Sequence, residues 1–384
     1  MKPSLLQGQT QTRPERGKSQ AHNGVHQLSP LTHRTQRFQQ LPDPLGEPPY
    51  HYDLESALPG ITEKAQKVGK IVFHTVGDTG GIKTPEYQEA VARAMKNDLN
   101  GIVDDGPSFF YHLGDVVYYN GKPNKYYDQF YEPYDHYRAP IFAIPGNHDG
   151  DPIDAAQTSL DGWGAYFMTA APHVDPISKD APRVTMSLPN VYYTLQCPFV
   201  TIVGMYTNVP EHGSVDSIQQ QWLTHELSTA SKEKALIVAM HHPIYSFDDH
   251  HSGSPAMADV LQHAINNSRR VPNMVLTAHV HNVQRTEKEI IKDLPTPFLV
   301  AGNGGCYHLH HLPVAAGYKD GSTGAKLIYG DDQSHGYVTL TVDAKNINGV
   351  VTLIDKTTGE VSHPNSFSYP ATAKTLPPNV VISL

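Results

Sequence analysis

Six short apolar runs in this chain each end abruptly in a cluster of glycine, aspartate, asparagine or histidine. The runs are residues 71–76, 109–113, 141–144, 236–240, 274–277 and 298–301. Near-continuous apolar runs of this length are typical of strands that are buried on both faces, as in parallel sheets covered by helices. Polar residues that follow such strands collect at the carboxyl edge of the sheet, where α/β proteins bind their ligands. The pattern therefore predicts an α/β fold with its chemistry at that edge.

The segments between and after these runs predict the remaining elements. Apolar residues recur with helical spacing over residues 86–97, 218–229 and 256–266, which predicts three helices. After Ser334 the apolar period changes to two, with a turn expected at 346–349 and a strand at 350–354. We interpret this last part as an antiparallel hairpin that closes the same domain.

Composition divides the chain into three parts. Residues 1–65 are rich in Gln, Pro, Thr, Ser and His, which predicts a disordered or extended N-terminal segment. Residues 66–370 are expected to form one domain, and residues 371–384 a C-terminal tail. Hydrophobic residues make up 39% of the chain, which is enough to fill a sizeable core.

Charge and hydropathy limit the partners of the protein. A net charge of −9 argues against a general affinity for nucleic acid or for an anionic membrane surface. The longest apolar stretch is about six residues (235–240), whereas crossing a bilayer takes roughly 20. No apolar signal segment is visible at the amino end, so we expect a soluble protein that is cytoplasmic or exported by a non-classical route.

Five short motifs follow the apolar runs in order. They are Gly77-Asp78-Thr79-Gly80, Gly114-Asp115-x-x-Tyr118, Gly146-Asn147-His148-Asp149, Val238-x-x-His241 and Ala278-His279-Val280-His281. Each motif alone has a simpler explanation, since Gly-Asp after a strand is often a turn with an Asx hydrogen bond, and short patterns match by chance. Their order at successive strand ends favours a metal site over five separate turns.

Together these motifs resemble those of the purple acid phosphatases, within the calcineurin-like metallophosphoesterases, over roughly residues 70–365. The resemblance implies a four-layer α/β/β/α sandwich with a catalytic domain at residues 66–370. It also implies a ferric ion and a divalent ion (Fe, Zn or Mn) that share one carboxylate. By the same resemblance the ferric ion is assigned to Asp78, Asp115, Tyr118 and His281, and the divalent ion to Asp115, Asn147, His241 and His279.

Tyr118 is the residue that points to iron. Most two-metal phosphoesterases have a histidine two residues after the first aspartate, but this chain has Gly80 there and gains a phenol three residues after Asp115. A phenol has an ordinary pKa near ~10, so a strongly Lewis-acidic ion such as ferric iron is needed to hold it as a phenolate at neutral or acid pH.

Three further histidines are the predicted catalytic groups. His148 follows Asn147, and either Asp149 or a backbone carbonyl would fix its tautomer. Plant members of the family carry a His-His pair at the separation that His250 and His251 have from His241. We expect His148, His250 and His251 to bind phosphate and to protonate the leaving alkoxide; the alternative for the pair is a solvated loop.

A second histidine cluster follows later in the chain. His308, His310 and His311 have two interpretations, contacts at the rim of the site or plain surface.

The predicted activity is metal-dependent acid phosphatase chemistry on a small phosphomonoester, by attack of a metal-bound hydroxide at an Fe(III)–M(II) centre. One alternative is a phosphodiesterase or nucleotidase of the same fold, because the metal ligands do not select the leaving group. Another is a non-catalytic phosphate- or metal-binding protein, although a pure binder has no use for a general acid. The sequence leaves the oligomeric state open.

Overall fold

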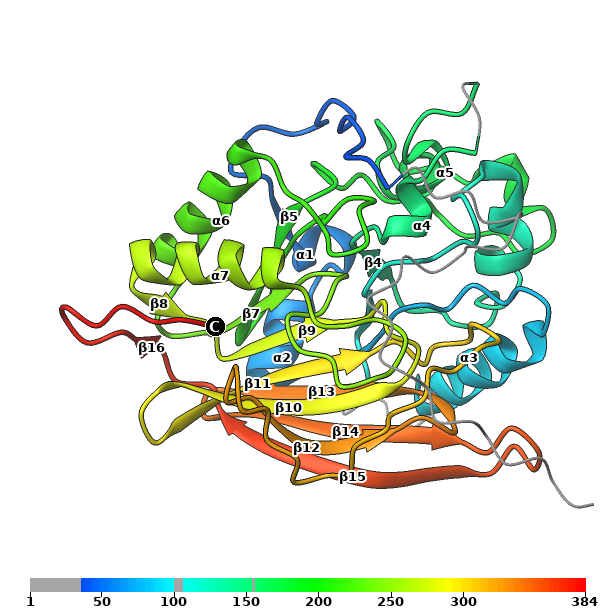
Figure 1. The fold of residues 1–384 in the computed structure, drawn as a ribbon. Helices are drawn as coiled ribbons and strands as arrows, with labels where there is room; N and C mark the ends of the chain where they lie inside the picture. The colour runs from blue at the N-terminus through cyan, green and yellow to red at the C-terminus, as the bar shows by residue number, and fades with distance from the viewer. Residues whose placement is uncertain (1–35, 100–105, 154–155) are drawn as a thin grey trace, which may run out of the picture. The chain divides into compact units, whose positions relative to one another are not determined.

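The computed structural model describes residues 36–99, 106–153 and 156–384, and within them two β-sheets face each other with helices outside (Figure 1). One sheet has eight strands in the described residues, in the order β1-β5-β6-β7-β9-β11-β10-β12. Their bounds are β1 His51–Asp53, β5 Tyr193–Gln196, β6 Val200–Gly204, β7 Ala235–Ala239, β9 Met274–Thr277, β10 Val283–Ile291, β11 Leu294–Ala301 and β12 Lys326–Asp331.

The other sheet has six strands in the same part of the chain, in the order β15-β14-β13-β2-β3-β4. Their bounds are β2 Lys70–Val76, β3 Phe109–His112, β4 Ile141–Ala143, β13 His335–Asp343, β14 Asn346–Ile354 and β15 Val361–Pro370. A short pair, β8 (Arg270–Val271) and β16 (Lys374–Thr375), lies apart from both sheets. The six apolar runs thus correspond to β2, β3, β4, β7, β9 and β11.

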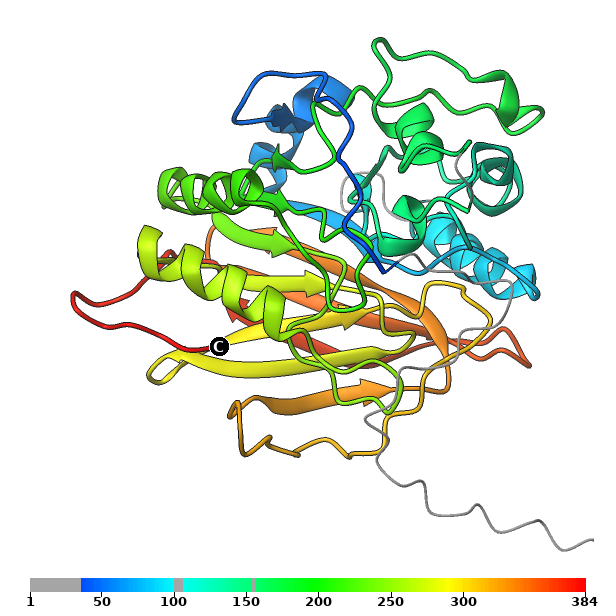
Figure 2. The same ribbon diagram turned by 45° about the horizontal axis from the view of Figure 1, so that its top comes forward.

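Helices cover the outer faces of the sheets. Figure 2 shows α6 (Ser217–Thr229) and α7 (Pro255–Ser268) side by side over the eight-stranded sheet, and α3 (Pro85–Leu99) packs against β13 of the other. These are the three helices that the sequence predicted, and the arrangement is the predicted α/β/β/α sandwich. The shorter helical segments are α1 Leu54–Ala57, α2 Ile61–Val68, α4 Asn147–Gly150, α5 Asp161–Phe167, η1 Pro123–Lys125, η2 Tyr127–Tyr131 and η3 Pro176–Ser178.

Local sequence explains where the two long outer helices begin. The side chain of Ser254 accepts a hydrogen bond from the backbone N–H of Met257 at the start of α7, and Pro255 occupies the first helical position. Asp216 caps α6 in the same way through Gln219 N–H. Such caps satisfy backbone donors that the first helical turn leaves without partners.

The two sheets make direct contact through tyrosine side chains. Tyr193 of β5 donates a hydrogen bond across the interface to the carbonyl of Ala143 in β4, at 3.2 Å. Tyr111 of β3 approaches Gly204 of β6 so closely that a Cβ there would lie 2.2 Å from the Tyr111 hydroxyl. The close packing holds the carboxyl ends of strands from both sheets near one another.

The predicted hairpin is present, but its turn lies earlier than expected. Strands β13 and β14 pair antiparallel, and β13 also pairs with β2, which joins the hairpin to the six-stranded sheet. Residues 346–349, the predicted turn, already belong to β14. Asp343 accepts hydrogen bonds from the backbone N–H groups of Lys345 and Asn346, at 2.7 and 2.9 Å, and thereby forms a tighter turn.

The N-terminal boundary at residue 65 needs correction, because the ordered part begins earlier. Strand β1 pairs in parallel with β5, and Leu54 is completely buried. Trp222 of α6 donates a hydrogen bond to the carbonyl of Pro49, at 2.7 Å. Backbone pairing and a few apolar anchors hold this segment, so its polar composition gave no periodic signal. The part of the prediction that concerns residues 1–35 lies outside the described residues.

The predicted C-terminal tail, residues 371–384, packs on the domain. Leu376 and Ile382 are buried, and Asn266 of α7 exchanges hydrogen bonds with the backbone of Ile382.

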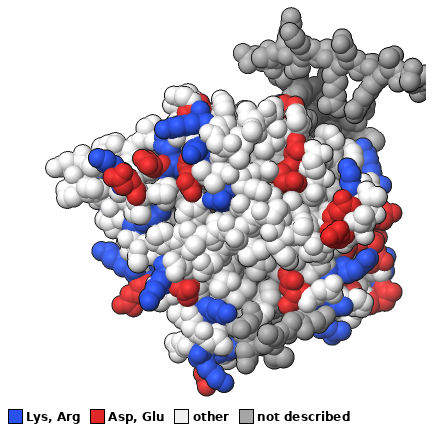
Figure 3. Space-filling view, turned by 90° about the horizontal axis from the view of Figure 1, so that it is seen from below, with Lys and Arg blue, Asp and Glu red and all other residues white. Residues whose placement is uncertain are grey.

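Two surface features bear on possible partners. On the face seen from below in Figure 1, basic and acidic side chains are interspersed around a broad uncharged area, so neither sign dominates that face (Figure 3). Within the described part of the chain, no helix has both the length and the apolar character needed to cross a membrane.

Candidate metal centre

The predicted metal ligands lie at the carboxyl ends of strands from both sheets. Asp78 follows β2, Asp115 follows β3 and Asn147 begins α4 directly after β4, all in the six-stranded sheet. From the eight-stranded sheet, His241 follows β7 and His279 follows β9. The side chains that the motifs placed on separate strands are therefore neighbours in space, and all five are buried.

Backbone conformation directs three of these side chains. Asp78, Asp115 and His279 have φ angles of 54°, 54° and 66°, in the left-handed region that non-glycine residues rarely adopt. Such conformations concentrate at functional sites, where surrounding structure holds them. Gly146 explains how Asp115 fits, because a Cβ at position 146 would lie 2.1 Å from Asp115 Oδ1.

Asp78, Tyr118 and His281 form the first group of donors. The Tyr118 hydroxyl donates to Asp78 Oδ1 at 2.9 Å and lies 3.1 Å from His281 Nε2. His281 Nε2 is itself 3.6 Å from Asp78 Oδ1. One carboxylate, one phenol and one imidazole thus converge on a small buried volume, as the ferric assignment requires.

Asn147, His241 and His279 form the second group. Asn147 Oδ1 lies 3.1 Å from His241 Nε2 and 2.9 Å from His279 Nδ1. The adjacent His242 belongs elsewhere, since its Nδ1 hydrogen-bonds Thr207 Oγ1 at 2.7 Å. An amide oxygen and two imidazoles make a neutral donor set, which suits a divalent ion such as zinc, iron or manganese.

Asp115 lies between the two groups. Its Oδ1 is 3.5 Å from His241 Nε2, in the second group. Carboxylate oxygens of Asp78 and Asp115 and a nitrogen of His241 all lie within 4.8 Å of one another. The carboxylate is therefore placed to contact an ion in either group, which is the geometry of a bridging ligand.

The outer nitrogen of each histidine faces an oxygen acceptor. His241 Nδ1 lies 2.8 Å from the carbonyl of Leu113, and His281 Nδ1 lies 2.8 Å from the carbonyl of His308. His279 instead has its Nε2 3.6 Å from Glu211 Oε1. Histidines that bind metals almost always donate their other N–H to such acceptors, which fixes the tautomer and directs the second nitrogen to the ion. These residues therefore fit a metal pair.

Electrostatics favours cations at this position. Burial raises the pKa of the Asp78 carboxyl well above its ordinary value, and the nearby Asp115 raises it further. Burial also raises the pKa of the Tyr118 phenol, as do Asp78 and Asp115. Bound cations would offset the cost of ionising Asp78 and Tyr118.

The structure shows which of the two predicted partners orients the His148 ring. His148 Nδ1 lies 2.8 Å from the carbonyl of Tyr119, and its Nε2 is 4.0 Å from Asp115 Oδ2. Asp149 does not contact the ring in the described hydrogen bonds; it accepts from the backbone N–H groups of Gly146, Val116 and Val117. Of the two predicted partners, the backbone carbonyl is the one present.

His250 and His251 lie in the loop after β7, beside the second group of donors. The His251 ring lies 4.3 Å from the His279 ring, and its Nδ1 hydrogen-bonds Glu211 Oε1. His250 is exposed and packs against His251, with ring centroids 4.6 Å apart. His251 therefore lies against the second group of donors, and His250 lies next to it on the solvent side.

Glu211 is the residue at this site that sequence reasoning missed. Burial alone would raise the pKa of its carboxyl, but the hydrogen bond from His251 and the nearby imidazole of His279 outweigh burial and lower it well below the ordinary value. The carboxylate thus contacts a predicted metal ligand and a predicted catalytic group at once. No motif marks Glu211, because it lies in a loop away from any strand end.

The N-terminal segment holds the loop that carries Glu211. Gln36 Oε1 accepts a hydrogen bond from the backbone N–H of Glu211, at 3.0 Å. Asn208 Oδ1 accepts from the backbone N–H of Gln39 at 2.7 Å, and its amide donates to the Gln39 carbonyl at 2.9 Å. Residues 36–39 therefore contribute to the site without supplying a ligand.

Replacing Glu211 with glutamine should weaken binding of the divalent ion by about 10- to 100-fold, the usual effect of losing a carboxylate that orients a metal-binding histidine. Competition with a chromogenic chelator would measure the dissociation constant. Glu233→Gln, at an exposed turn, is the matched control and should bind the ion as the unaltered protein does. Equal affinities in the two variants would show that Glu211 does not orient His279.

Comparison with known proteins identifies the family of this chain. The model for the calcineurin-like phosphoesterase family matches residues 71–283, which is more than half of the chain. The chain belongs to the calcineurin-like phosphoesterase family. The matched region contains all seven of the predicted metal ligands.

Related proteins indicate which group within the family this chain is similar to. Tartrate-resistant acid phosphatase type 5 of Mus musculus is 25% identical over 211 residues, covering 50% of this chain and 62% of the relative. The Rattus norvegicus enzyme is 24% identical over 204 residues, covering 50% of this chain and again 62% of the relative. The match therefore spans about three fifths of these relatives. The chain is similar to the purple acid phosphatases, as its motifs predicted.

Two solved structures share the fold at low identity. A purple acid phosphatase from yellow lupin seeds superposes with a TM-score of 0.56 at 18% identity, covering 78% of this chain and 54% of that one. The anchor in the inner membrane complex of Plasmodium gives 0.55 at 15% identity, covering 80% and 90%. The first of these proteins is a phosphatase and the second an anchor, so the fold alone does not establish catalysis.

Proposed function

We propose that this metallophosphoesterase hydrolyses phosphomonoesters at a ferric and a divalent ion. The observation that carries the proposal is the position of the Tyr118 hydroxyl, 2.9 Å from Asp78 Oδ1 and 3.1 Å from His281 Nε2. A phenol, a carboxylate and an imidazole in this arrangement suit a hard trivalent ion, which can ionise a phenol whose pKa burial raises.

Charge explains why a phosphate ester would bind there. A trivalent and a divalent ion together exceed the three negative charges of Asp78, Asp115 and a Tyr118 phenolate. Asn147, His241 and His279 add donors without adding negative charge, so the site keeps a positive excess that attracts phosphate. When bound, the ions would polarise the phosphoryl oxygens and supply the nucleophile.

The surrounding residues would position the substrate and handle protons. His148, held through the Tyr119 carbonyl, presents its Nε2 toward the side of Asp115. His251 is held by Glu211 beside the His279 ring, with His250 next to it. A protonated imidazole here would stabilise the leaving alkoxide, and general acids of this kind contribute typically about 10²–10⁴-fold to the rate.

A visible charge-transfer band tests the ferric assignment. The purified protein should contain iron and a second metal and show a broad visible absorption, because a phenolate bound to ferric iron absorbs there. Tyr118→Phe should abolish the band, whereas Tyr119→Phe, which alters the adjacent phenol, should leave it in place. Absorption that persists in Tyr118→Phe would refute the phenolate assignment.

A panel of small phosphate esters tests the reaction class. We expect monoesters to be hydrolysed faster than diesters. Comparable rates on diesters would favour the phosphodiesterase or nucleotidase alternative, and a protein that binds two metals but hydrolyses nothing would be a non-catalytic binder.

A further inference from the structure

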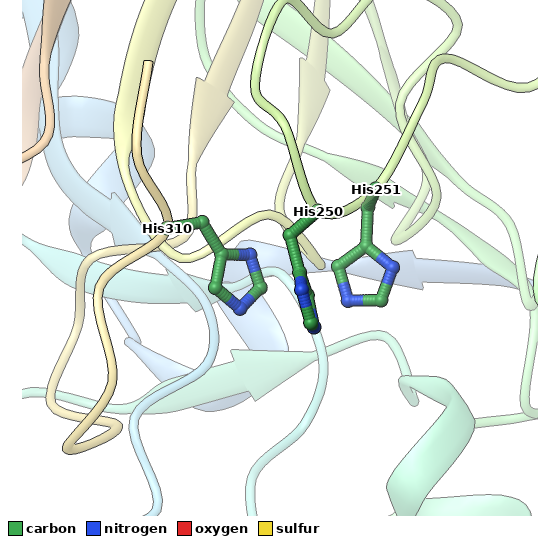
Figure 4. A group of neighbouring side chains, drawn as sticks. All are labelled: His250, His251 and His310. Carbon is green, nitrogen blue, oxygen red and sulfur yellow. The ribbon is translucent and has the colours of Figure 1, made fainter. Parts of the chain in front are cut away.

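A cluster of three imidazoles lies outside the two groups of metal donors. His250 and His251 come from the loop after β7, and His310 comes from the loop after β11. Figure 4 shows the three rings side by side; their centroids are 4.3 Å (His250–His310), 4.6 Å (His250–His251) and 5.0 Å (His251–His310) apart. One ring nitrogen from each lies within 4.8 Å of the others.

Carboxylates support two of these rings from behind. Asp248, whose side chain is completely buried, places Oδ2 3.3 Å from Nδ1 of His310. The same residue accepts a hydrogen bond from the backbone N–H of His251 through Oδ1, at 3.0 Å. Glu211 contacts Nδ1 of His251. Both rings thus turn their Nε2 away from a carboxylate, which is the arrangement that prepares histidine to bind zinc.

A second group also approaches Nδ1 of His310. The backbone N–H of His281 donates a hydrogen bond to this nitrogen at 3.3 Å, and so competes with Asp248 for it. Asp248 Oδ2 lies at the same distance, and a bound cation would favour its ionised form, which attracts a proton to Nδ1 and leaves Nε2 as the ligand atom.

The three histidines of the cluster differ in their exposure to solvent. His310 is 3% exposed, His251 is partly buried and His250 is exposed. An ion would therefore have one fixed inner ligand and an open side toward solvent for a water molecule. Three protein ligands with one open position is a common arrangement for zinc in proteins.

The cluster favours a cation over a phosphate group. Asp248 and Glu211 are its nearest charged supports, and both are acidic. Carboxylates this close to the rings would attract a cation and repel a phosphate group.

We propose that His250, His251 and His310 form a third cation site, selective for zinc or a similar imidazole-binding ion, whose occupation inhibits hydrolysis. Inhibition follows because the ion would hold His250 and His251 away from the leaving group. The inhibition rests on the proposed function, whereas the binding of the third ion does not.

The test starts from protein saturated with its two metals and freed of excess ions, at pH 7.5. Zinc chloride alone is then added, and bound zinc is counted by equilibrium dialysis with elemental analysis. We expect one additional zinc per chain, with hydrolysis of a monoester falling in parallel. No additional zinc above the starting content would overturn the proposal.

Variants identify the site. His310→Asn, which keeps a polar side chain beside Asp248, should weaken binding of the additional zinc at least tenfold. Asp248→Asn should weaken it by about 10- to 100-fold through loss of the orienting carboxylate. His311→Asn, an exposed neighbour paired with Asp332, is the control and should bind zinc normally. Unchanged zinc affinity in both folded variants would contradict the assignment.

The two proposals fail in different ways. If the protein binds the additional zinc through His310 but has no phosphomonoesterase activity, the third cation site stands and the proposed function is refuted. Inhibition that is the same in His310→Asn would instead mean that zinc acts at the other metal ligands, which would refute the third site.

Discussion

Replacing Asp115 with asparagine should reduce the content of both metals and lower phosphomonoester hydrolysis by about a thousandfold or more. The carboxylate lies beside donors of both groups, with Oδ1 3.5 Å from His241 Nε2 and its oxygens near those of Asp78. An amide there removes the negative charge that the two cations would share. Loss of roughly 4 kcal/mol of transition-state stabilisation corresponds to that factor.

Asn147→Ala is the informative comparison for this result. Asn147 lies beside His241 and His279 in the second group, so its loss should reduce the divalent ion and leave most of the iron. Elemental analysis of both purified variants measures the difference, and thermal unfolding checks that each remains folded. The same metal content in both variants would contradict a bridging role for Asp115.

The strands that the sequence predicted best are the most deeply buried ones. Strands β2, β7 and β9 have almost every side chain buried, so each appears in the sequence as a near-continuous apolar run. By contrast, β10 contains charged residues such as Glu287 and Glu289 because part of it faces solvent, and β1 has only three residues. Partly exposed and very short strands produce no such run, which is why they were not predicted.

The candidate site was predictable to the extent that its residues directly follow strands. Asp78, Asp115 and His241 are fixed by where a strand ends, so order along the chain was enough to group them. The supporting contacts were not predictable in this way. Glu211 comes from a loop held by Gln36, and the ring of His241 is oriented by a backbone carbonyl, which any residue supplies. Contacts of this kind depend on how distant loops pack, and a single sequence does not encode them as a local pattern.

The loss of activity on replacing His250 and His251 should depend on the leaving group of the substrate. An alkyl phosphate releases a strongly basic alkoxide that needs a proton, whereas nitrophenyl phosphate releases a phenolate that scarcely does. Replacing both histidines with alanine should therefore slow alkyl phosphate hydrolysis by about 10²–10³-fold, within the usual range for a general acid, and nitrophenyl phosphate hydrolysis by less than about tenfold.

Structure adds a reason to assign the larger share of this effect to His251. Glu211 holds its Nδ1, and its ring lies 4.3 Å from His279, over the second group of donors. His250 is exposed and has more freedom to move. The single variant His251→Ala should thus reproduce most of the selective loss on alkyl esters, with His311→Ala as an unaffected control, in kinetics measured without added zinc. Equal losses on both esters would mean that these histidines bind the phosphate group, since a contact to phosphate is common to both substrates and a proton for the leaving group is not.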